Sequence, residues 1–271
     1  MKKGYRKILL EIAIILSPLL LFPFKRLVLS IGKIIMNERI SEGSITIIEG
    51  MATNIATNVQ WIIIAFLIFF IYFKIKKRNH DKEFNFGNEY MEYPYFVFFI
   101  AGKVLGFKSI NLKLVPIYLQ ARIIINDTFE EIKYQDDLGD IDYEATSTFS
   151  CGEVRNKELT LVLEDTFFIK ENQLGANLSE TDILRITKGN LIENVRNHSE
   201  NFINKIASNI FKLEKKYQVI NICATTNTKH TFEIISNSFK KGSRGDVKKL
   251  VVYQQNRDGD RVFEKGYEIK L

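Results

Sequence analysis

The chain has 271 residues, of which 46% are apolar, and a formal net charge of +6. The excess charge lies in residues 1–78, which hold 12 Lys and Arg against 4 Asp and Glu, whereas residues 79–271 hold 26 against 28. Positive charge that flanks apolar segments is typical of membrane orientation, so we expect no nucleic-acid partner. The length suits one ordinary domain with additional elements.

The residues that usually hold metals or carry catalysis are few and scattered. The chain has two cysteines, Cys151 and Cys223, and its three histidines lie far apart in sequence. No CxxC pair, GxSxG or HExxH occurs, so we expect no disulfide framework, no metal site and no cofactor. Ser150-Cys151-Gly152 resembles a nucleophile turn, but no partnered histidine is visible, and an incidental cysteine is the preferred interpretation.

Two apolar segments lie within the first 78 residues. The first covers about residues 8–24 and the second about residues 57–73, close to the ~17–25 residues that a helix needs to cross a bilayer. We predict that residues 1–78 form a transmembrane hairpin, with the lipid bilayer as partner. Lys25 and Arg26 follow the first segment in place of an A-x-A-like cleavage site, which favours an uncleaved anchor over a signal peptide.

Basic clusters predict how the hairpin is oriented. Four Lys and Arg residues precede the first segment and four follow the second within residues 74–78. Residues 25–56 also hold four, but these are spread out and offset by three Glu residues. The denser clusters favour the cytoplasmic side. We therefore expect a multi-pass protein of the cell inner membrane, N-in and C-in, with a cytoplasmic C-terminal domain.

Three residues of the hairpin attract attention. Trp61 and Tyr72 lie near the two ends of the second segment, where amphipathic rings favour the membrane interface. Glu11 is an ionisable group among aliphatic residues. It either lines the interior of a helix bundle in a homo-oligomer or, as we prefer, reaches the headgroups four residues beyond Lys7. Residues 25–36 alternate basic and apolar side chains and suit either an amphipathic interfacial helix or an ordinary loop.

A polar linker, residues 79–92, leads to a domain over residues 93–271. Residues 93–107 are very apolar but short for a span, so we expect a buried element or a membrane-lying surface rather than a third crossing. Residues 111–127 and 159–169 are rich in β-branched and apolar residues, which predicts strands. The acidic loop DDLGDID between them, from residue 136, lacks the spacing of a calcium loop and is interpreted as solvated surface.

The C-terminal third contains the clearest periodicity. Residues 179–216 are predicted to be helical, with Ser179 as N-cap and a division at Gly189. His198 is expected to lie on the solvated side of this helix. Strand, helix and strand patterns then cover about residues 217–255, and NRDGD predicts a hairpin turn into a last strand. The fold class is therefore α+β or α/β, a mixed sheet with flanking helices.

One cluster could bind a ligand. In open α/β sheets, ligands bind beyond the carboxyl ends of strands and beside helix N-termini. Thr225, Thr226, Asn227, Lys229 and His230 occupy that place, and Arg244 follows in a glycine-containing loop. These residues could hold a small anionic or nucleotide ligand. Helix capping by Thr and Asn explains the same pattern and is the preferred interpretation, since neither GxGxxG nor a P-loop occurs.

The layout of a two-helix hairpin followed by a cytosolic α/β domain is similar to the general plan of bacterial two-span effectors in anti-phage defence and nucleotide-signalling systems. That resemblance implies a domain that senses a signal and spans that oligomerise to perturb the membrane. Two other functions stay open. The domain could be a tethered enzyme that acts on a phosphorylated or nucleotide substrate through residues 225–230, or a structural tether that recruits a partner protein.

Overall fold

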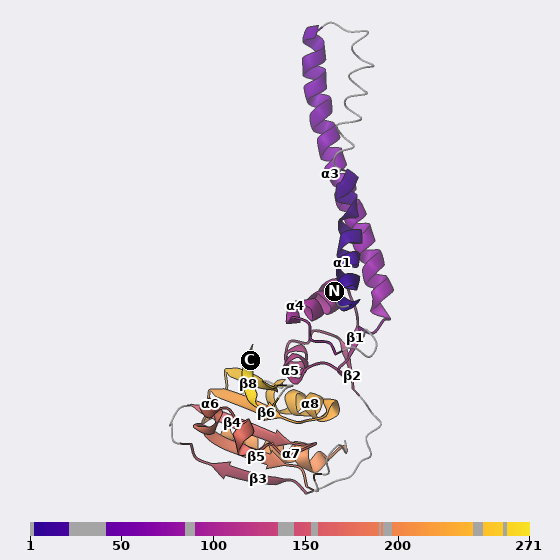
Figure 1. The fold of residues 1–271 in the computed structure, drawn as a ribbon. Helices are drawn as coiled ribbons and strands as arrows, with labels where there is room; N and C mark the ends of the chain where they lie inside the picture. The colour runs from indigo at the N-terminus through magenta and orange to yellow at the C-terminus, as the bar shows by residue number, and fades with distance from the viewer. Residues whose placement is uncertain are drawn as a thin grey trace. The chain divides into compact units, whose positions relative to one another are not determined.

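The structure is a computed structural model, and it describes residues 3–21, 42–84, 90–134, 144–152, 157–189, 191, 197–240, 246–256 and 259–271. For residues 42–57 only the backbone is described. The chain divides into two compact units, each considered by itself (Figure 1). Unit 1 comprises Met1–Phe86 and Ile100–Lys108, and unit 2 comprises Gly87–Phe99 and Ser109–Leu271. The interfacial helix or loop predicted for residues 25–36, the acidic loop from residue 136, and Arg244 lie outside the described residues.

Unit 1 is built on two helical segments that run antiparallel. Helix α1 (Lys3–Leu16) continues into the 3₁₀ segment η1 (Ser17–Leu21), and helix α3 (Glu42–His80) returns beside them (Figure 1). The α-helix ends at Leu16, two residues before Pro18, because proline lacks the amide that an α-helical turn needs and disfavours helical backbone in the residue before it. The Gln60 side chain donates a hydrogen bond to the Leu21 carbonyl at 3.1 Å, near one end of the pair.

One helix among the described residues is long and apolar enough to cross a membrane, over Asn58–His80. It contains the second predicted span. The first predicted span, about residues 8–24, is described only as far as residue 21, where it lies in α1 and η1. These two elements together are about 31 Å long at the usual rise per residue. Large apolar side chains of both segments face outward, including Leu20, Ile62 and Phe66, the last 66% exposed.

The apolar residues 93–107 form a short helix, not a span. Helix α4 (Tyr95–Phe99) is followed by the π-helical turn η2 (Ile100–Val104), ten residues in all, which is too short for a crossing. Val97, Phe98 and Ala101 are fully buried, as expected of a buried element, whereas Phe96 and Phe99 are about half exposed, as expected of a membrane-lying surface, so both predicted alternatives stay open. Within unit 1, Phe107 contacts Phe84 edge-on at 5.3 Å between ring centroids.

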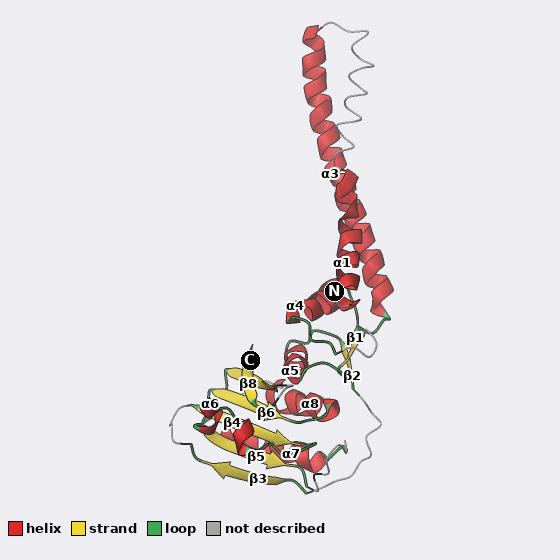
Figure 2. Cartoon of the chain, viewed as in Figure 1, coloured by secondary structure: helices red, strands yellow, loops and turns green. Residues whose placement is uncertain are grey.

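Unit 2 contains a six-stranded mixed sheet in the order β3-β5-β4-β6-β7-β8 (Figure 2). The four central strands are parallel, and the strand at each edge is antiparallel to its neighbour. The strands are β3 (Thr146–Ser150), β4 (Glu158–Glu164), β5 (Asp182–Thr187), β6 (Val219–Ala224), β7 (Lys249–Gln255) and β8 (Phe263–Lys270). The predicted mixed sheet with flanking helices is confirmed for this unit.

The sheet order contains a topological switch point. The chain passes from β4 to β5 on one side, and then to β6 on the other side of β4. Connections from neighbouring strands therefore leave in opposite directions between β4 and β6. Such a point leaves a crevice at the carboxyl ends of the two strands, and this is where open α/β sheets bind ligands.

Both faces of the sheet are covered. On one face, Leu163, Ile222 and Val252 pack beneath helices α5 (Ile117–Ile125) and α8 (Thr228–Ile235). On the other, Val162 and Cys223 join a cluster with Leu178 of α6 (Ala176–Ser179) and Phe263. Alternate residues of one strand thus serve opposite layers, as the period of a strand requires. Burial on two sides explains why the central strands are almost continuously apolar.

The remaining elements complete the layers. Helix α7 (Glu200–Leu213) begins at Ser199, whose hydroxyl accepts a hydrogen bond from the Phe202 amide. Its residues Phe202, Ile206 and Ile210 are buried at helical spacing, as predicted. Helix α8 continues into the π-helical turn η4 (Ser236–Lys240). A 3₁₀ turn, η3 (Glu171–Gln173), precedes α6, and strands β1 (Ser109–Asn111) and β2 (Glu131–Lys133) form a separate parallel pair.

Two predicted elements were wrong. Most of residues 111–127 is helix α5, not strand, because Ala121 and Ile124 are buried at helical spacing and the residues after Pro116 pack against α8. Residues 182–187 form strand β5, not the start of a helix; Leu184 and Ile186 alternate inward with period two. In both cases tertiary packing outweighs local propensity. Ser179 is consequently the last residue of α6 and caps no long helix.

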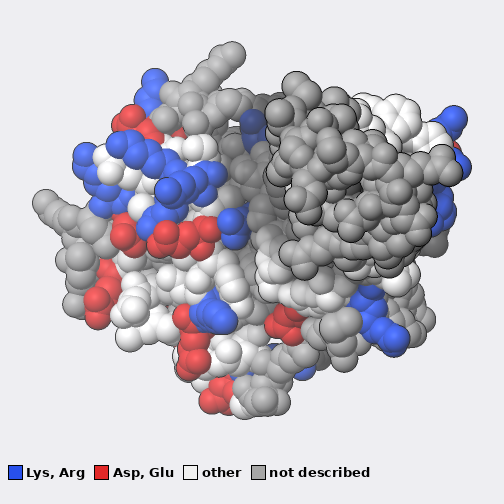
Figure 3. Space-filling model, turned by 90° about the horizontal axis from the view of Figure 1, so that it is seen from above, with Lys and Arg blue, Asp and Glu red and all other residues white. Residues whose placement is uncertain are grey.

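Charge is interspersed on the visible surface. On the face in Figure 3, basic side chains lie beside acidic ones among the described residues. An ion pair between Lys249 and Glu268, at 2.9 Å, joins β7 and β8.

Candidate functional site

The loops after β4 and β6 are tied together at the switch point. Thr225 donates its amide to the Leu163 carbonyl at 3.0 Å, and its hydroxyl donates to the Phe167 carbonyl at 3.1 Å. In return, the Thr166 hydroxyl donates to the Thr225 carbonyl at 2.7 Å. These threonines are used to hold the two loops in register. The result is a rigid floor at the carboxyl edge of the sheet.

A pocket of about 310 Å³ opens above this floor, within unit 2. Its walls are residues 113–115, 166–167, 224–228 and 253–255, with Tyr90, Ile117 and Gln120. The volume is within the ~300–1,000 Å³ that is usual for small-molecule sites. The predicted position beyond the strand ends therefore borders an open pocket.

Two glutamines carry unsatisfied amide atoms in the pocket lining. Gln120 is buried and donates its Nε2 to the Val115 carbonyl at 2.7 Å, which leaves its Oε1 without a partner among the described residues. Gln255, the last residue of β7, has a buried Nε2 that likewise has no acceptor in the described part of the chain. A buried polar group without a partner costs about 1–3 kcal/mol. The pocket lining thus includes two residues that each keep one buried, unpaired amide atom, an acceptor on Gln120 and a donor on Gln255.

The rest of the lining mixes aromatic, hydroxyl and cationic groups. Burial raises the pKa of the Tyr253 phenol, with contributions from the nearby Cys223 and Glu158, so the phenol stays protonated and can donate a hydrogen bond. Lys113 is exposed at the rim. Next to it, Leu114 has a φ of 66°, a left-handed conformation that a leucine rarely adopts. Strain of this kind often accumulates at functional sites.

The first turn of helix α8 forms another part of the wall. Asn227 caps this helix and accepts a hydrogen bond from the His230 amide at 2.8 Å. The amides of Thr228 and Lys229 lie in the first turn, where an α-helix offers no internal acceptor, and no other acceptor is found for them among the described residues. Thr228 also lines the pocket. The positive end of the helix dipole therefore lies at the pocket wall.

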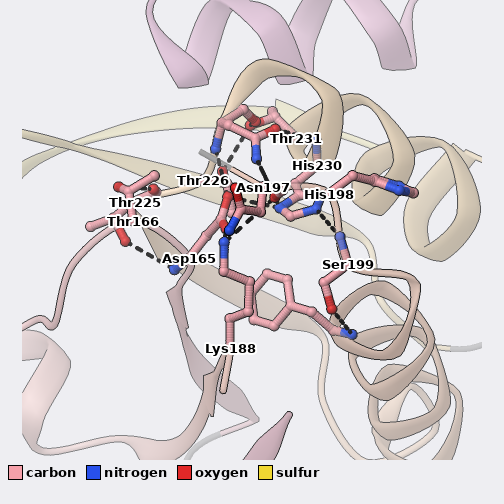
Figure 4. A network of polar contacts seen from close by, with 12 residues as sticks. Asp165, Thr166, Lys188, Asn197, His198, Ser199, Thr225, Thr226, His230 and Thr231 are labelled. Carbon is pink, nitrogen blue, oxygen red and sulfur yellow. Dashed lines mark hydrogen bonds and ion pairs between the residues drawn. The ribbon is translucent and has the colours of Figure 1, made fainter. Parts of the chain in front are cut away.

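A buried polar network adjoins the pocket, because Asn227 belongs to both. Figure 4 shows this network with Asp165, Lys188 and His230 labelled. Asp165, the first residue after β4, is fully buried, and its Oδ1 accepts from Lys188 Nζ at 2.6 Å. Its Oδ2 accepts from His230 Nδ1 at 2.8 Å and from the Asn227 amide at 2.9 Å. Burial raises the pKa of Asp165, but the hydrogen bond from His230 and the charge of Lys188 outweigh burial and hold that pKa below its ordinary value.

The hydrogen bonds assign the protonation of His230. The Ser199 amide donates to Nε2 at 3.0 Å, so Nε2 carries no proton. The ring proton therefore lies on Nδ1 and is donated to Asp165, which makes the imidazole neutral in this assignment. Asp165 and Lys188 neutralise one another beside it. The network fixes the backbone of Asn227 from behind, and neither His230 nitrogen is free for proton transfer to a ligand.

The structure separates the predicted ligand residues into three groups. Thr225, Thr226 and Asn227 line the pocket, with the Asn227 side chain also serving as the helix cap that the alternative interpretation foresaw. Lys229 and His230 do not line it, and His230 is fully buried. His198 is not solvated as predicted: it precedes α7, is mostly buried and contacts Glu233 at 2.9 Å.

Sequence reasoning missed Gln120, Lys113, Tyr253 and Gln255. Tyr253 and Gln255 lie on β7, Gln120 lies on α5, and Lys113 lies in the turn before α5, so these residues meet only in the tertiary structure. The network residues Asp165 and Lys188 follow the two parallel strands β4 and β5 directly. A charged residue directly after each of two apolar strands was a usable signal for Asp165, since parallel strands end at one edge.

In unit 1, Glu11 takes part in a buried polar cluster between α1 and α3. It is 2% exposed, and its carboxylate accepts from Arg78 at 2.9 Å and from the Asn79 side chain at 2.7 Å. The same Asn79 amide donates to the Leu105 carbonyl at 3.2 Å. The preferred prediction, that Glu11 reaches outward to headgroups, was therefore wrong within this unit. Trp61 is half exposed on α3, and Tyr72 is partly buried and contacts Phe73.

Comparison with known proteins assigns a family. The SMODS- and Ubiquitin system-associated 2TM effector domain (SUa-2TM) matches residues 1–270. The chain belongs to this family of two-transmembrane effector domains. No curated protein matches the sequence significantly.

Among solved structures, the chain is similar to the Cap4 SAVED/CARF-domain containing receptor of Acinetobacter baumannii. With the cyclic trinucleotide 3′3′3′-cAAA bound to that receptor, the identity is 10% and the TM-score 0.46, over 65% of this chain and 42% of the receptor. With 2′3′3′-cAAA bound, the identity is 11% and the TM-score 0.45 over the same shares. The chain thus covers less than half of the receptor's length.

Proposed function

We propose that this member of the 2TM effector family is a membrane-anchored sensor of the inner membrane, whose cytosolic unit 2 binds a nucleotide signal in the switch-point pocket. In this proposal, occupancy of the pocket controls membrane perturbation by oligomerised spans of unit 1 in a defence response. The observation that carries the ligand assignment is the unpaired acceptor of Gln120 and the unpaired donor of Gln255 in one pocket.

The chemistry of the lining supports a nucleotide. A nucleobase edge offers adjacent donors and acceptors, which can satisfy Gln120 Oε1 and Gln255 Nε2 together. Tyr253 and Phe167 supply aromatic surface on which a base can stack. For the phosphate, Lys113 offers a charge and the first turn of α8 offers free amides. Thr225 and Asn227 are then part of the ligand site, whereas Lys229, His230 and Arg244 carry no part of the argument.

The membrane part of the proposal is supported by the family and by unit 1. The apolar stretch of α3 within Asn58–His80 suits one crossing, and α1 with η1 has a length suited to another. With the basic residues 74–78 on the cytoplasmic side, the hairpin is N-in and C-in. A reporter fused after Leu271 is expected to be active in the cytoplasm, and periplasmic activity would refute this orientation.

Ligand binding is tested with the full chain in nanodiscs and a panel of cyclic di- and trinucleotides, by equilibrium dialysis. Gln255→Leu and Gln120→Leu are expected to abolish binding of the nucleotide that the native protein retains. Gln255→Leu removes an unsatisfied buried donor, so its thermal stability without ligand should be equal or higher, whereas Gln120→Leu also removes the hydrogen bond to the Val115 carbonyl and should be somewhat less stable. Gln218→Leu, at the amino end of β6, is the matched control and should bind normally.

The effector step is tested in bacteria with a membrane-potential dye. Co-expression with the source of the bound nucleotide is expected to depolarise the membrane, and Gln255→Leu is expected to prevent this. Binding without depolarisation would support a tether that recruits a partner. If neither the native chain nor Gln218→Leu binds any nucleotide of the panel, the sensing proposal is refuted.

A further inference from the structure

A groove of about 520 Å³ lies within unit 1, between α1 and the last part of the apolar stretch of α3. It is lined by Ile14 of α1 and by Ile71, Lys74, Ile75, Lys77 and Arg78 of α3. Ile71, Lys74, Ile75 and Arg78 are spaced as neighbours on one face of a helix. The groove thus has apolar walls on the side of the apolar stretch and three cations on the side where that stretch ends.

The cations of the groove exceed its anions. Arg78 is paired with Glu11 at 2.9 Å. Lys74 lies over the Phe70 ring at 5.1 Å, and neither it nor Lys77 has an acidic partner among the residues that the structure describes. Three positive charges and one negative charge leave a local excess of two. Burial of this excess against a negative group is favourable, and more so near the low dielectric of a bilayer.

From this combination we infer that the groove binds a phospholipid with an anionic headgroup. One acyl chain lies against Ile14, Ile71 and Ile75, and the phosphate is held by Lys74 and Lys77. This inference rests on the membrane location of unit 1 but is independent of the nucleotide pocket of unit 2. A second copy of the chain fits the groove poorly, because a symmetric contact would bring the same lysines together. A free phosphate would leave the apolar walls uncovered.

A bound anionic lipid also explains why Lys74, Lys77 and Arg78 of α3 all line one groove. Basic pockets beside transmembrane helices on the cytoplasmic side are a known means of recognising anionic headgroups. Arg78 then has two roles: it neutralises the buried Glu11 on one side, and on the other its half-exposed guanidinium faces the headgroup region. The lipid would join α1 to α3 at the membrane surface.

The experiment is native mass spectrometry of the full chain in a mild detergent, titrated with phosphatidylglycerol or phosphatidylcholine. The native chain is expected to retain one phosphatidylglycerol and to bind phosphatidylcholine much more weakly. Lys74→Gln with Lys77→Gln should weaken phosphatidylglycerol retention about thirtyfold, which corresponds to about 1 kcal/mol for each basic residue.

The matched control removes two lysines that do not line the groove. Lys76 lies on the same turn of α3 with its stem against Gly106, and Lys82 follows the helix. Lys76→Gln with Lys82→Gln changes the net charge equally and should retain the lipid. Equal losses in both double variants would show a general surface-charge effect and overturn the groove assignment.

Two further measurements separate the source of the phosphate from the shape of the site. Ile14→Trp fills the groove without changing charge and should lower phosphatidylglycerol retention, whereas a normal level would overturn the acyl assignment. Inorganic phosphate at millimolar concentration should not displace the lipid. Displacement by phosphate alone would mean that the site binds a free anion, and the proposal would fall.

Discussion

Exposed phenylalanines occur in both units, but their neighbours differ. On α3, Phe66 is 66% exposed among other outward apolar side chains such as Ile62 and Phe69. On α7 of unit 2, Phe211 is 71% exposed, yet its neighbours Lys212 and Asn209 are polar. In unit 2 the large apolar residues of the central strands are buried instead. The comparison teaches that exposure alone does not identify a membrane surface; a continuous apolar band does.

Each unit contains a buried carboxylate, and the two carboxylates differ in their partners. Asp165 in unit 2 has a full set of partners from a lysine, a histidine and a backbone amide. Glu11 in unit 1 is paired with an arginine that is half exposed. The first arrangement stabilises loops around a pocket. The second joins two helices at a point where one partner still reaches solvent or headgroups, so its removal should be less severe.

The largest expected effect comes from removing the Asp165 charge. Asp165→Asn leaves the buried ammonium of Lys188 without a counter-ion and should lower the free energy of unfolding of unit 2 by about 3–5 kcal/mol. Chemical denaturation of the full chain in detergent, followed by circular dichroism, measures this. Asp165→Leu with Lys188→Met removes both charges and should recover part of the loss, because the His230 ring N–H and the Asn227 amide still lose their acceptor. Equal losses in both variants would show that the pair itself, not the orphaned charge, is decisive.

A charge in the apolar band tests the membrane side of the comparison. Phe66→Arg should lower insertion of α3 by about 3 kcal/mol, the difference between the two residues near the centre of a span. The fraction of protein that resists alkaline extraction from membranes should therefore fall. Phe211→Arg, with an equally exposed side chain in unit 2, is the control and should leave it unchanged. If Phe211→Arg lowered the membrane-bound fraction and Phe66→Arg did not, the membrane contact would lie on unit 2 and this prediction would be wrong.

Loss of the Glu11 side chain should have a smaller effect. Glu11→Ala leaves the fully buried Asn79 amide without one acceptor, a loss of about 1–3 kcal/mol. A disulfide engineered between positions 21 and 60, in a Cys151→Ser background, would then form in lower yield, because α1 is held less firmly on α3. Glu11→Gln keeps an acceptor for the Asn79 amide, so its disulfide yield should lie between the yields of the native chain and Glu11→Ala. Unchanged yield in Glu11→Ala would contradict the role of this cluster.

The smallest effect is the acid dependence of unit 2. Asp165 has a lowered pKa in the folded state, so its ionisation stabilises the fold above the unfolded pKa of about 3.9, and this contribution is lost as pH falls through the folded pKa. The free energy of unfolding should drop below about pH 4 by at most ~1.4 kcal/mol per pH unit from this group. In Asp165→Leu with Lys188→Met, the drop should be shallower when both are titrated by denaturation.

Elements with a clear local pattern were predicted from the sequence, and elements that depend on contacts with distant segments were not. Strands β4, β6, β7 and β8 and helix α8 were predicted because each carries a local periodicity with a clear start or stop. Helix α5 was missed because its β-branched residues resemble a strand until Pro116 and the contact with α8 are considered. Strand β5 was missed because six residues following a capping-like Ser179 are too few to display their alternation clearly.

Composition and order alone determined the uneven charge of the chain, the apolar stretch of α3 and the position of Thr225–Asn227 beyond a strand, since these are properties of neighbouring residues. Only the tertiary structure decided which residues surround that position. Gln255 is brought to it by the place of β7 in the sheet, and Gln120 and Lys113 by the packing of α5 against α8 and β7. Both depend on contacts between segments that are distant in sequence. The burial of Glu11 against Arg78 and Asn79 was decided in the same way, by the packing of α1 on α3.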